Sequence, residues 1–163
     1  MSDRPSLDVD AAIERWDKQK ANFIKTLDLH LVDIGHGEAS MRMPFRVQVQ
    51  NGAGAVHGGA IVSLCDTVFW VALASIYGPT QPTATAALSC AFLRPALPPH
   101  DLIAHARVRK PGRRIVYGDV EVFSNDKLVA HATFSFLNTP LEEARGWNPS
   151  PEIASADGPE AES

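Results

Sequence analysis

Cysteine is scarce in this chain, since its 163 residues include only Cys65 and Cys90. Neither belongs to a Cys-x-x-Cys pair or has a histidine at metal-ligand spacing, so the sequence predicts no metal site and gives no sign of a disulfide framework. Both lie in apolar stretches, which is typical of buried thiols in a reducing compartment. Neither cysteine has a histidine beside it in the sequence, so a cysteine nucleophile is unsupported.

The pattern of a signal peptide is also missing, because the first twenty residues are polar and charged and contain no apolar middle segment. The one long apolar run, which ends at Tyr77, is interrupted by Asp66 and lacks flanking charge anchors. We therefore do not expect it to span a membrane. Together these absences predict a cytoplasmic protein.

The overall composition is ordinary, with 45% hydrophobic and 21% charged residues, and suits one domain with a single core. From Pro140 onward Pro, Ser, Ala and Glu dominate, so we expect residues 140–163 to be a disordered acidic tail with Trp147 as its only candidate anchor. This tail holds six acids against Arg145 and accounts for more than the whole net charge of −4. The negative net charge of the whole chain therefore says little about the charge of the folded domain.

The periodicity of apolar residues predicts an α+β domain. In the leader, residues 1–28, Ser6 or Asp8 could cap a lid or packing helix over residues 9–27. Alternation of apolar and polar residues predicts six strands, all candidates for antiparallel pairing, over residues 29–34, 38–46, 83–94, 101–110, 114–124 and 127–138. General layer rules allow such a sheet to pack on one helix but do not choose the topology.

That helix is expected within the stretch from Asn51 to Tyr77, which has glycines at its start and Gly78-Pro79 after its end. Ser63, Asp66 and Thr67 share one face, and apolar residues cover the rest. A buried carboxylate is costly unless it is paired, so Asp66 is either satisfied structurally or held for chemistry.

A longer pattern links these residues to a known family. Asn51, Gly54, His57-Gly58-Gly59, Leu64 and Asp66-Thr67 resemble the N-x-x-G-x-x-H-G-G-x-x-x-x-L-x-D signature of hotdog-fold acyl-CoA thioesterases, in the phenylacetyl-CoA thioesterase-like branch. The resemblance runs from about residue 30 to 139. It implies a hotdog domain over residues 29–139, in which a curled antiparallel sheet of about six strands wraps one long helix. It also implies hydrolysis of acyl-CoA to free acid and CoA, without a cofactor.

Thioester hydrolysis needs an attacking water or carboxylate and donors for the oxyanion that forms. Asp66 could be the general base or the nucleophile, and the N–H of Gly58 at the helix start could be the oxyanion donor. By resemblance, Asn51 binds the thioester carbonyl or the water, and Thr85 orients the water. His57 is a candidate base, although in similar proteins it chiefly holds the loop by hydrogen bonding.

The substrate would need further contacts. We place Gly59, Thr67 and Trp70 beside it, although Trp70 is equally able to be a core residue. Six cations lie between residues 94 and 114 against one acid: Arg94, Arg107, Arg109, Lys110, Arg113 and Arg114. They are either a solvated hairpin tip or a phosphate site for CoA, for which Arg94, Arg113 and Arg114 are our candidates. The patch has no interleaved aromatics, so a nucleic-acid partner is not expected.

The spacing of Gly58 and Asp66 adds a constraint. Eight residues correspond to roughly 12 Å of helix rise, which is too far for both groups to contact one carbonyl carbon. If both act in one site, a partner helix must supply one of them, and a two-fold dimer is the minimal enzyme, with a tetramer also open. The small-residue strand from Thr83 to Ala91 is a candidate to pair with its own copy.

Two other function classes stay open. One is a hotdog dehydratase or hydratase that acts on acyl thioesters, against which the absence of the Pro-Gly loop after the histidine counts. The other is a non-catalytic sensor that binds acyl-CoA, and the presence of Asp66 together with Asn51 argues against it. The sequence does not decide between aryl and fatty acyl groups.

Overall fold

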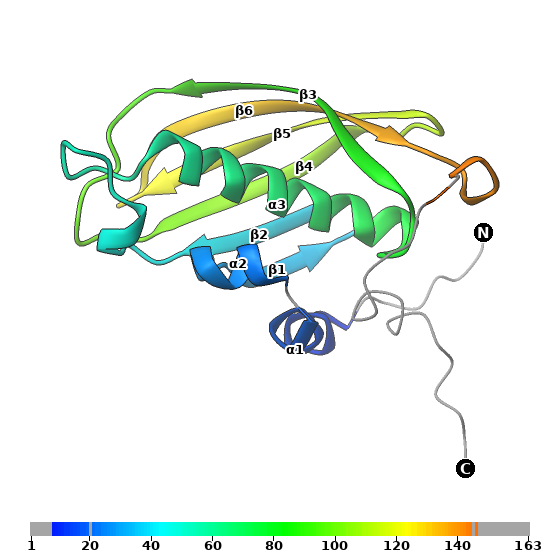
Figure 1. The fold of residues 1–163 in the computed structure, drawn as a ribbon, viewed down its shortest axis with the longest axis horizontal. Helices are drawn as coiled ribbons and strands as arrows, with labels where there is room; N and C mark the ends of the chain where they lie inside the picture. The colour runs from blue at the N-terminus through cyan, green and yellow to red at the C-terminus, as the bar shows by residue number, and fades with distance from the viewer. Residues whose placement is uncertain (1–7, 20, 145, 147–163) are drawn as a thin grey trace, which may run out of the picture.

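The computed structural model describes residues 8–19, 21–144 and 146 (Figure 1). Its helices are α1 (Val9–Gln19), α2 (Asn22–Leu27) and α3 (Gly58–Tyr77), with two short 3-10 helices, η1 (Val47–Val49) and η2 (Leu141–Glu143). Its strands are β1 (His30–Gly35), β2 (Glu38–Met43), β3 (Thr83–Phe92), β4 (Leu102–Lys110), β5 (Ile115–Ser124) and β6 (Lys127–Asn138).

The six strands form one sheet in the order β1-β2-β4-β5-β6-β3, and every neighbouring pair is antiparallel. Turn residues fix the hairpin between β5 and β6, because Asn125 and Asp126 both have positive φ, as a two-residue turn between right-twisted strands requires. After α3 the chain enters β3, which lies at the edge of the sheet opposite β1. The two edge strands are therefore β1 and β3. All six strands that the alternation predicts are present.

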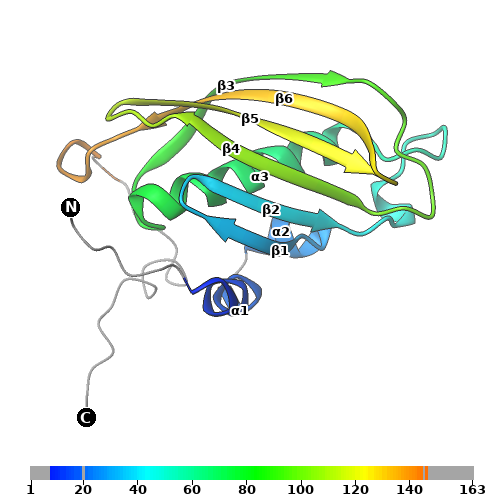
Figure 2. The same cartoon turned by 180° about the vertical axis from the view of Figure 1, so that it is seen from behind.

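The long helix α3 lies across the concave side of the curled sheet, and Figure 2 shows the outer side of the sheet with no helix over it. Burial of one face explains the packing, because Leu64, Val68 and Phe69 are fully buried in the core. Phe69 stacks on Phe134 with 5.1 Å between ring centroids. By length and composition α3 could cross a membrane, but here it is the core helix of the sheet.

This arrangement is the one that the hotdog resemblance implied. The prediction of a single leader helix over residues 9–27 is wrong in detail, because α1 and α2 are separate helices. Ala21 has extended backbone, with φ −63° and ψ 160°, and α2 starts after it. Asp8 does cap α1, since its Oδ1 accepts a hydrogen bond from Ala11 N–H at 3.1 Å, whereas Ser6 lies outside the described residues.

Most of the predicted acidic tail, including Arg145, Trp147 and everything after it, also lies outside the described residues. The described beginning of that segment contains η2. Glu143 at its end forms an ion pair of 3.0 Å with Arg114 on the turn between β4 and β5. The segment from Pro140 therefore starts with a short ordered turn against the domain.

Candidate active site

The start of α3 is built around His57, which caps the helix. Its Nδ1 accepts a hydrogen bond of 2.9 Å from Gly59 N–H, and its carbonyl accepts the N–H of Ala60 at 2.9 Å. Within the described part of the chain, the N–H of Gly58 has no acceptor. It is therefore a first-turn donor that is free to bind a ligand oxygen, at the positive end of the helix dipole.

Space beside Gly58 is limited by an aromatic ring. A Cβ at Gly58 would lie 3.1 Å from Cζ of Phe92 at the end of β3, which is closer than an ordinary contact. Glycine at this position therefore lets the helix start pack directly against that ring. The sequence analysis missed Phe92, whose only signal was a large aromatic residue at the end of an otherwise small-residue strand.

Asn51 organises the loop that precedes α3. Its Oδ1 accepts hydrogen bonds from Ala53 N–H at 2.9 Å and Ala55 N–H at 3.2 Å, while its own N–H donates to the carbonyl of Ala55 at 2.8 Å. This is the hydrogen-bonding pattern of a turn-forming asparagine. The amide nitrogen Nδ2 is the part of the side chain that is left to reach a substrate.

Asp66 lies two turns further along α3 and is half-buried. Its Oδ1 accepts a hydrogen bond of 2.7 Å from Oγ1 of Thr85 on β3. This contact joins the two residues that the sequence analysis placed in one site, although they are far apart in the chain. A hydrogen bond to a carboxylate fixes its orientation and leaves Oδ2 available for another partner.

A pocket of about 480 Å³ opens beside this pair. It contains the predicted site residues Asp66, Thr67, Trp70 and Thr85, and its lining is mainly apolar. Asn51, His57, Gly58 and Gly59 are not part of its lining. Asn51 lies in the loop before α3, and the other three lie at the start of the helix. One chain therefore holds two separated halves of the predicted site, one with the carboxylate and one with the free backbone N–H.

Cys65 is adjacent to Asp66 but points into the core, where it is fully buried. Burial raises the pKa of its thiol far above the ordinary value, with smaller contributions in the same direction from Cys90 and Asp66. The pKa of Cys90 is also raised by burial. Since the thiolate is the reactive form, neither cysteine is suited to be a nucleophile.

The six cations between residues 94 and 114 do not form one patch. Arg107 and Arg109 lie on β4, where they pair with Glu38 at 2.7 Å and Asp119 at 2.8 Å. Arg94 donates to the carbonyl of Leu128 near the start of β6. Arg113 and Arg114 lie in the turn between β4 and β5, next to the other end of β6, where the carbonyl of Arg114 accepts the N–H of Asn138 at 2.9 Å. Arginines from one short stretch of the sequence are thus separated by the full length of β6.

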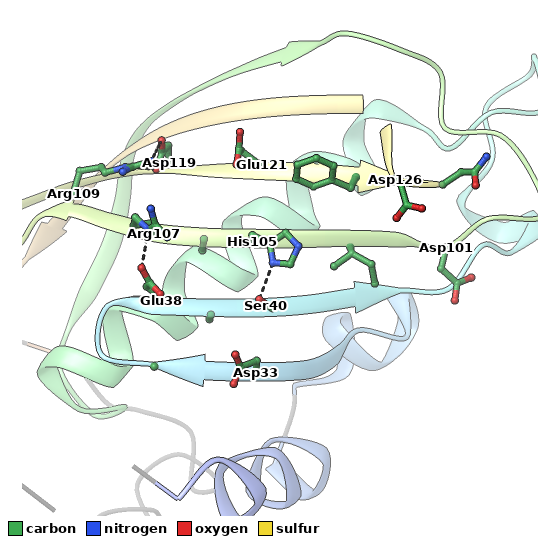
Figure 3. Close-up of a pocket in the computed structure, with 16 residues that line it drawn as sticks. Asp33, Glu38, Ser40, Asp101, His105, Arg107, Arg109, Asp119, Glu121 and Asp126 are labelled. Carbon is green, nitrogen blue, oxygen red and sulfur yellow. Dashed lines mark hydrogen bonds and ion pairs between the residues drawn. The ribbon is translucent and has the colours of Figure 1, made fainter. Parts of the chain in front are cut away.

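A larger hollow, of about 820 Å³, lies on the outer face of the sheet (Figure 3). Strand register places Ser40, His105 and Glu121 side by side across β2, β4 and β5, and Ser40 Oγ lies 2.8 Å from His105 Nδ1. Arg107 and Arg109 of this hollow are held by their acidic strand neighbours. We therefore place the candidate active site at Asp66, where a carboxylate lies beside an apolar pocket, and not in this open charged surface.

Comparison with known proteins now decides the family. The sequence model of the Thioesterase superfamily matches residues 53–131, which include α3, the whole of β3, β4 and β5, and the start of β6. The acyl-coenzyme A thioesterase PaaI of Escherichia coli K12 is 32% identical over 105 residues, which are 63% of this chain and 71% of that protein. The chain belongs to the thioesterase superfamily. The predicted resemblance to hotdog-fold acyl-CoA thioesterases is thereby confirmed.

Solved structures give the same answer for the fold. The structure of the E. coli PaaI protein superposes with a TM-score of 0.72 and 26% identity, covering 80% of this chain and 93% of that one. A conserved protein of Pseudomonas aeruginosa, PA5202, gives a TM-score of 0.71 and 28% identity, covering 76% and 98%. The hotdog fold expected from the sequence is confirmed by these likenesses.

Proposed function

We propose that this protein hydrolyses acyl-CoA thioesters to a free acid and CoA, as a cytoplasmic homo-oligomer with a dimer as its minimal active unit. The observation that carries the proposal is the carboxylate of Asp66, held by Thr85 at the mouth of an apolar pocket. The name of the E. coli relative, an acyl-coenzyme A thioesterase, supports the same substrate class.

In this proposal Asp66 is either the general base or the nucleophile. As a general base it takes a proton from water as the water oxygen attacks the thioester carbon; as a nucleophile it attacks that carbon itself, and water then hydrolyses the mixed anhydride. In both routes the carbon–sulfur bond breaks and CoA leaves as the thiol after gaining a proton. Thr85 orients the carboxylate or the water, and the N–H of Gly58 stabilises the oxyanion.

The separation of the two half-sites supports a dimer. Asp66 and Gly58 are eight residues apart on a regular helix, or roughly 12 Å along its axis, so one helix cannot bring both to one carbon. The strand β3 is suited to bring in a second copy, because it is a sheet edge of ten residues that is exposed on both faces. Its Leu88 and Phe92 have exposed fractions of 42% and 55%, an unusual surface for a free edge.

The contacts of β3 suggest the register of that pairing. Thr85 contacts Asp66, and Phe92 contacts Gly58. If two copies of β3 pair antiparallel with Thr85 opposite Phe92 of the partner subunit, then Asp66 faces Gly58 of the partner subunit. The same register brings Arg94 of the partner subunit to the end of the molecule where Arg113 and Arg114 lie, so cations that are separated in one chain would surround one CoA.

A substrate panel with a matched variant tests the function. Short, long and aromatic acyl-CoA thioesters are incubated with the protein, and release of free thiol and the acyl product are measured. We expect thiol release with the wild type, and a loss of about 10² to 10⁴ in rate for Asp66→Asn, which is nearly isosteric. The control is Asp33→Asn on β1, outside the pocket, which should keep the rate.

Each outcome of this panel has a definite meaning. A hydratase would return a modified acyl group with its thioester intact, and a sensor would bind acyl-CoA with no turnover. Either result would overturn the proposal. So would an Asp66→Asn protein that hydrolyses at the wild-type rate.

A further inference from the structure

The leader helix α1 forms one side of the pocket that holds Asp66. Ala12, Arg15 and Trp16 of α1 line it together with Thr67 and Trp70 of α3. Helix α1 packs on β1, the edge strand furthest from β3 (Figure 1). These residues precede the segment matched by the superfamily model, so this wall comes from a part of the chain outside that match.

Trp16 is the fixed part of this wall. Its Nε1 donates a hydrogen bond of 3.3 Å to the carbonyl of Leu29, thirteen residues along the chain. The ring is half-buried and packs against the edge of the core. A large ring with only two side-chain torsions, tied at its polar end, presents a well-defined surface to a ligand.

The pocket has a direction. Asp66 and Thr85 lie at the β3 side, and Leu31, Ile34 and Trp16 lie at the β1 side, with the exposed face of α3 between them. An acyl group whose thioester carbon is at Asp66 would extend across Trp70 and Ala74 toward α1. The remote end of a longer acyl group would then meet the ring of Trp16.

We propose that Trp16 is a specificity-determining residue that limits the length of the acyl group, with α1 as the end wall of the acyl-binding pocket. The inference rests on the proposed thioesterase function. It adds that apolar acyl groups long enough to cross α3 are discriminated by the leader and not by the segment that carries the family signature.

The test compares kcat/KM for hexadecanoyl-CoA with kcat/KM for butanoyl-CoA in three variants. Trp16→Ala opens the wall and should raise the ratio of kcat/KM for the long substrate to that for the short one about tenfold or more. The reason is that each methylene bound in an apolar pocket changes kcat/KM by about tenfold or more. Ala12→Met fills the same wall and should lower the ratio. Glu14→Ala changes the exposed side of α1, where Glu14 forms an ion pair with Lys18, and should leave the ratio unchanged.

The results separate this inference from the proposed function. If the wild type hydrolyses no acyl-CoA, the function itself fails. If it does, and neither Trp16→Ala nor Ala12→Met changes the ratio relative to Glu14→Ala, the wall is elsewhere and the inference is overturned. If Trp16→Ala does not fold, Ala12→Met is a sufficient test by itself. Ala12 lies on the surface of a helix, so the longer methionine side chain adds volume to the pocket.

Discussion

Thr85 Oγ1 and Asp66 Oδ1 are joined by a hydrogen bond of 2.7 Å, which links the edge strand β3 to the face of α3 that lines the pocket. The bond gives the carboxylate a fixed rotamer and gives β3 a polar contact to the helix. A second chain that pairs with the free edge of β3 would therefore contact the strand that holds Asp66, the proposed catalytic group.

Replacing Thr85 with valine removes this donor at nearly constant shape. A hydrogen bond to a charged group contributes about 1.5–3 kcal/mol, so we expect kcat with the best acyl-CoA to fall about 10- to 100-fold. KM should change much less, because the lost contact orients the carboxylate and not the acyl group. Thr85→Ser keeps the donor and serves as the control. Equal kcat values for the valine and serine variants would show that the bond only anchors β3.

The proposed β3 register can be trapped with one new cysteine. With the register shift that β3 shows after Thr85, pairing Thr85 with Phe92 of the partner subunit places Leu88 opposite Cys90 of the partner subunit. Both side chains then lie on the inner face of the sheet, at a Cα separation that suits a disulfide. We therefore expect Leu88→Cys to give a covalent dimer under mild oxidation, visible on a non-reducing gel. Adding Cys90→Ser should abolish it. A cross-link that survives Cys90→Ser, or no cross-link at all, would contradict this register.

Arg113 and Arg114 are exposed at the turn between β4 and β5, and the ion pair of Arg114 with Glu143 is solvent-exposed and therefore weak. If they bind CoA phosphates, replacing both with alanine should raise KM for acyl-CoA about tenfold and leave kcat/KM for the matching acyl-pantetheine unchanged. Arg107→Ala on the outer face is the control, and it should change neither KM for acyl-CoA nor kcat/KM for the acyl-pantetheine. An equal loss on both thioesters would mean that the turn shapes the site instead of binding phosphate.

The strands could be predicted from the sequence because alternation and turn chemistry coincide. Residues 127–138 agree with β6 at both ends, and the turn at Asn125 and Asp126 separates it from β5 as expected. The leader could not be divided in the same way. Its apolar positions continue across Ala21 with a helical spacing, and nothing in that spacing reports that the backbone of Ala21 is extended.

The local part of the candidate site was predictable from a short pattern, whereas Thr85 could be placed beside Asp66 only through the family resemblance. His57, Gly58 and Gly59 sit in one turn, so a short pattern describes them. The arginines illustrate the opposite case, because Arg94 and Arg113 are close in number but lie at opposite ends of β6. The sequence analysis missed Trp16 as a pocket residue, because an apolar residue at helical spacing is equally well explained by packing against the core. Only the fold brings Trp16 into the same pocket as Trp70.

Gly118 on β5 gives a prediction about the fold itself. A Cβ at this position would lie 2.3 Å from the carbonyl oxygen of Arg107 on β4 and 2.4 Å from Cε2 of Phe69 on α3. The first contact is with the backbone of a paired strand, and the second is with a fully buried ring in the aromatic cluster, so neither can move away without disturbing the core. The sequence pattern of the strand does not show that Gly118 is needed for close packing, because a glycine within a strand can also simply weaken that strand.

We therefore expect Gly118→Ala to lower the free energy of unfolding by about 1–3 kcal/mol, the usual cost of overpacking a core. Gly52→Ala is the matched control, since a Cβ there meets nothing within 4 Å and the backbone needs no left-handed conformation. Its unfolding free energy should stay within about 0.5 kcal/mol of the wild type. The measurement is the midpoint and slope of unfolding in urea for the three proteins, at one protein concentration so that association contributes equally. If Gly118→Ala unfolds at the same midpoint as Gly52→Ala, then α3 does not pack on the sheet as closely as Phe69 and Gly118 imply.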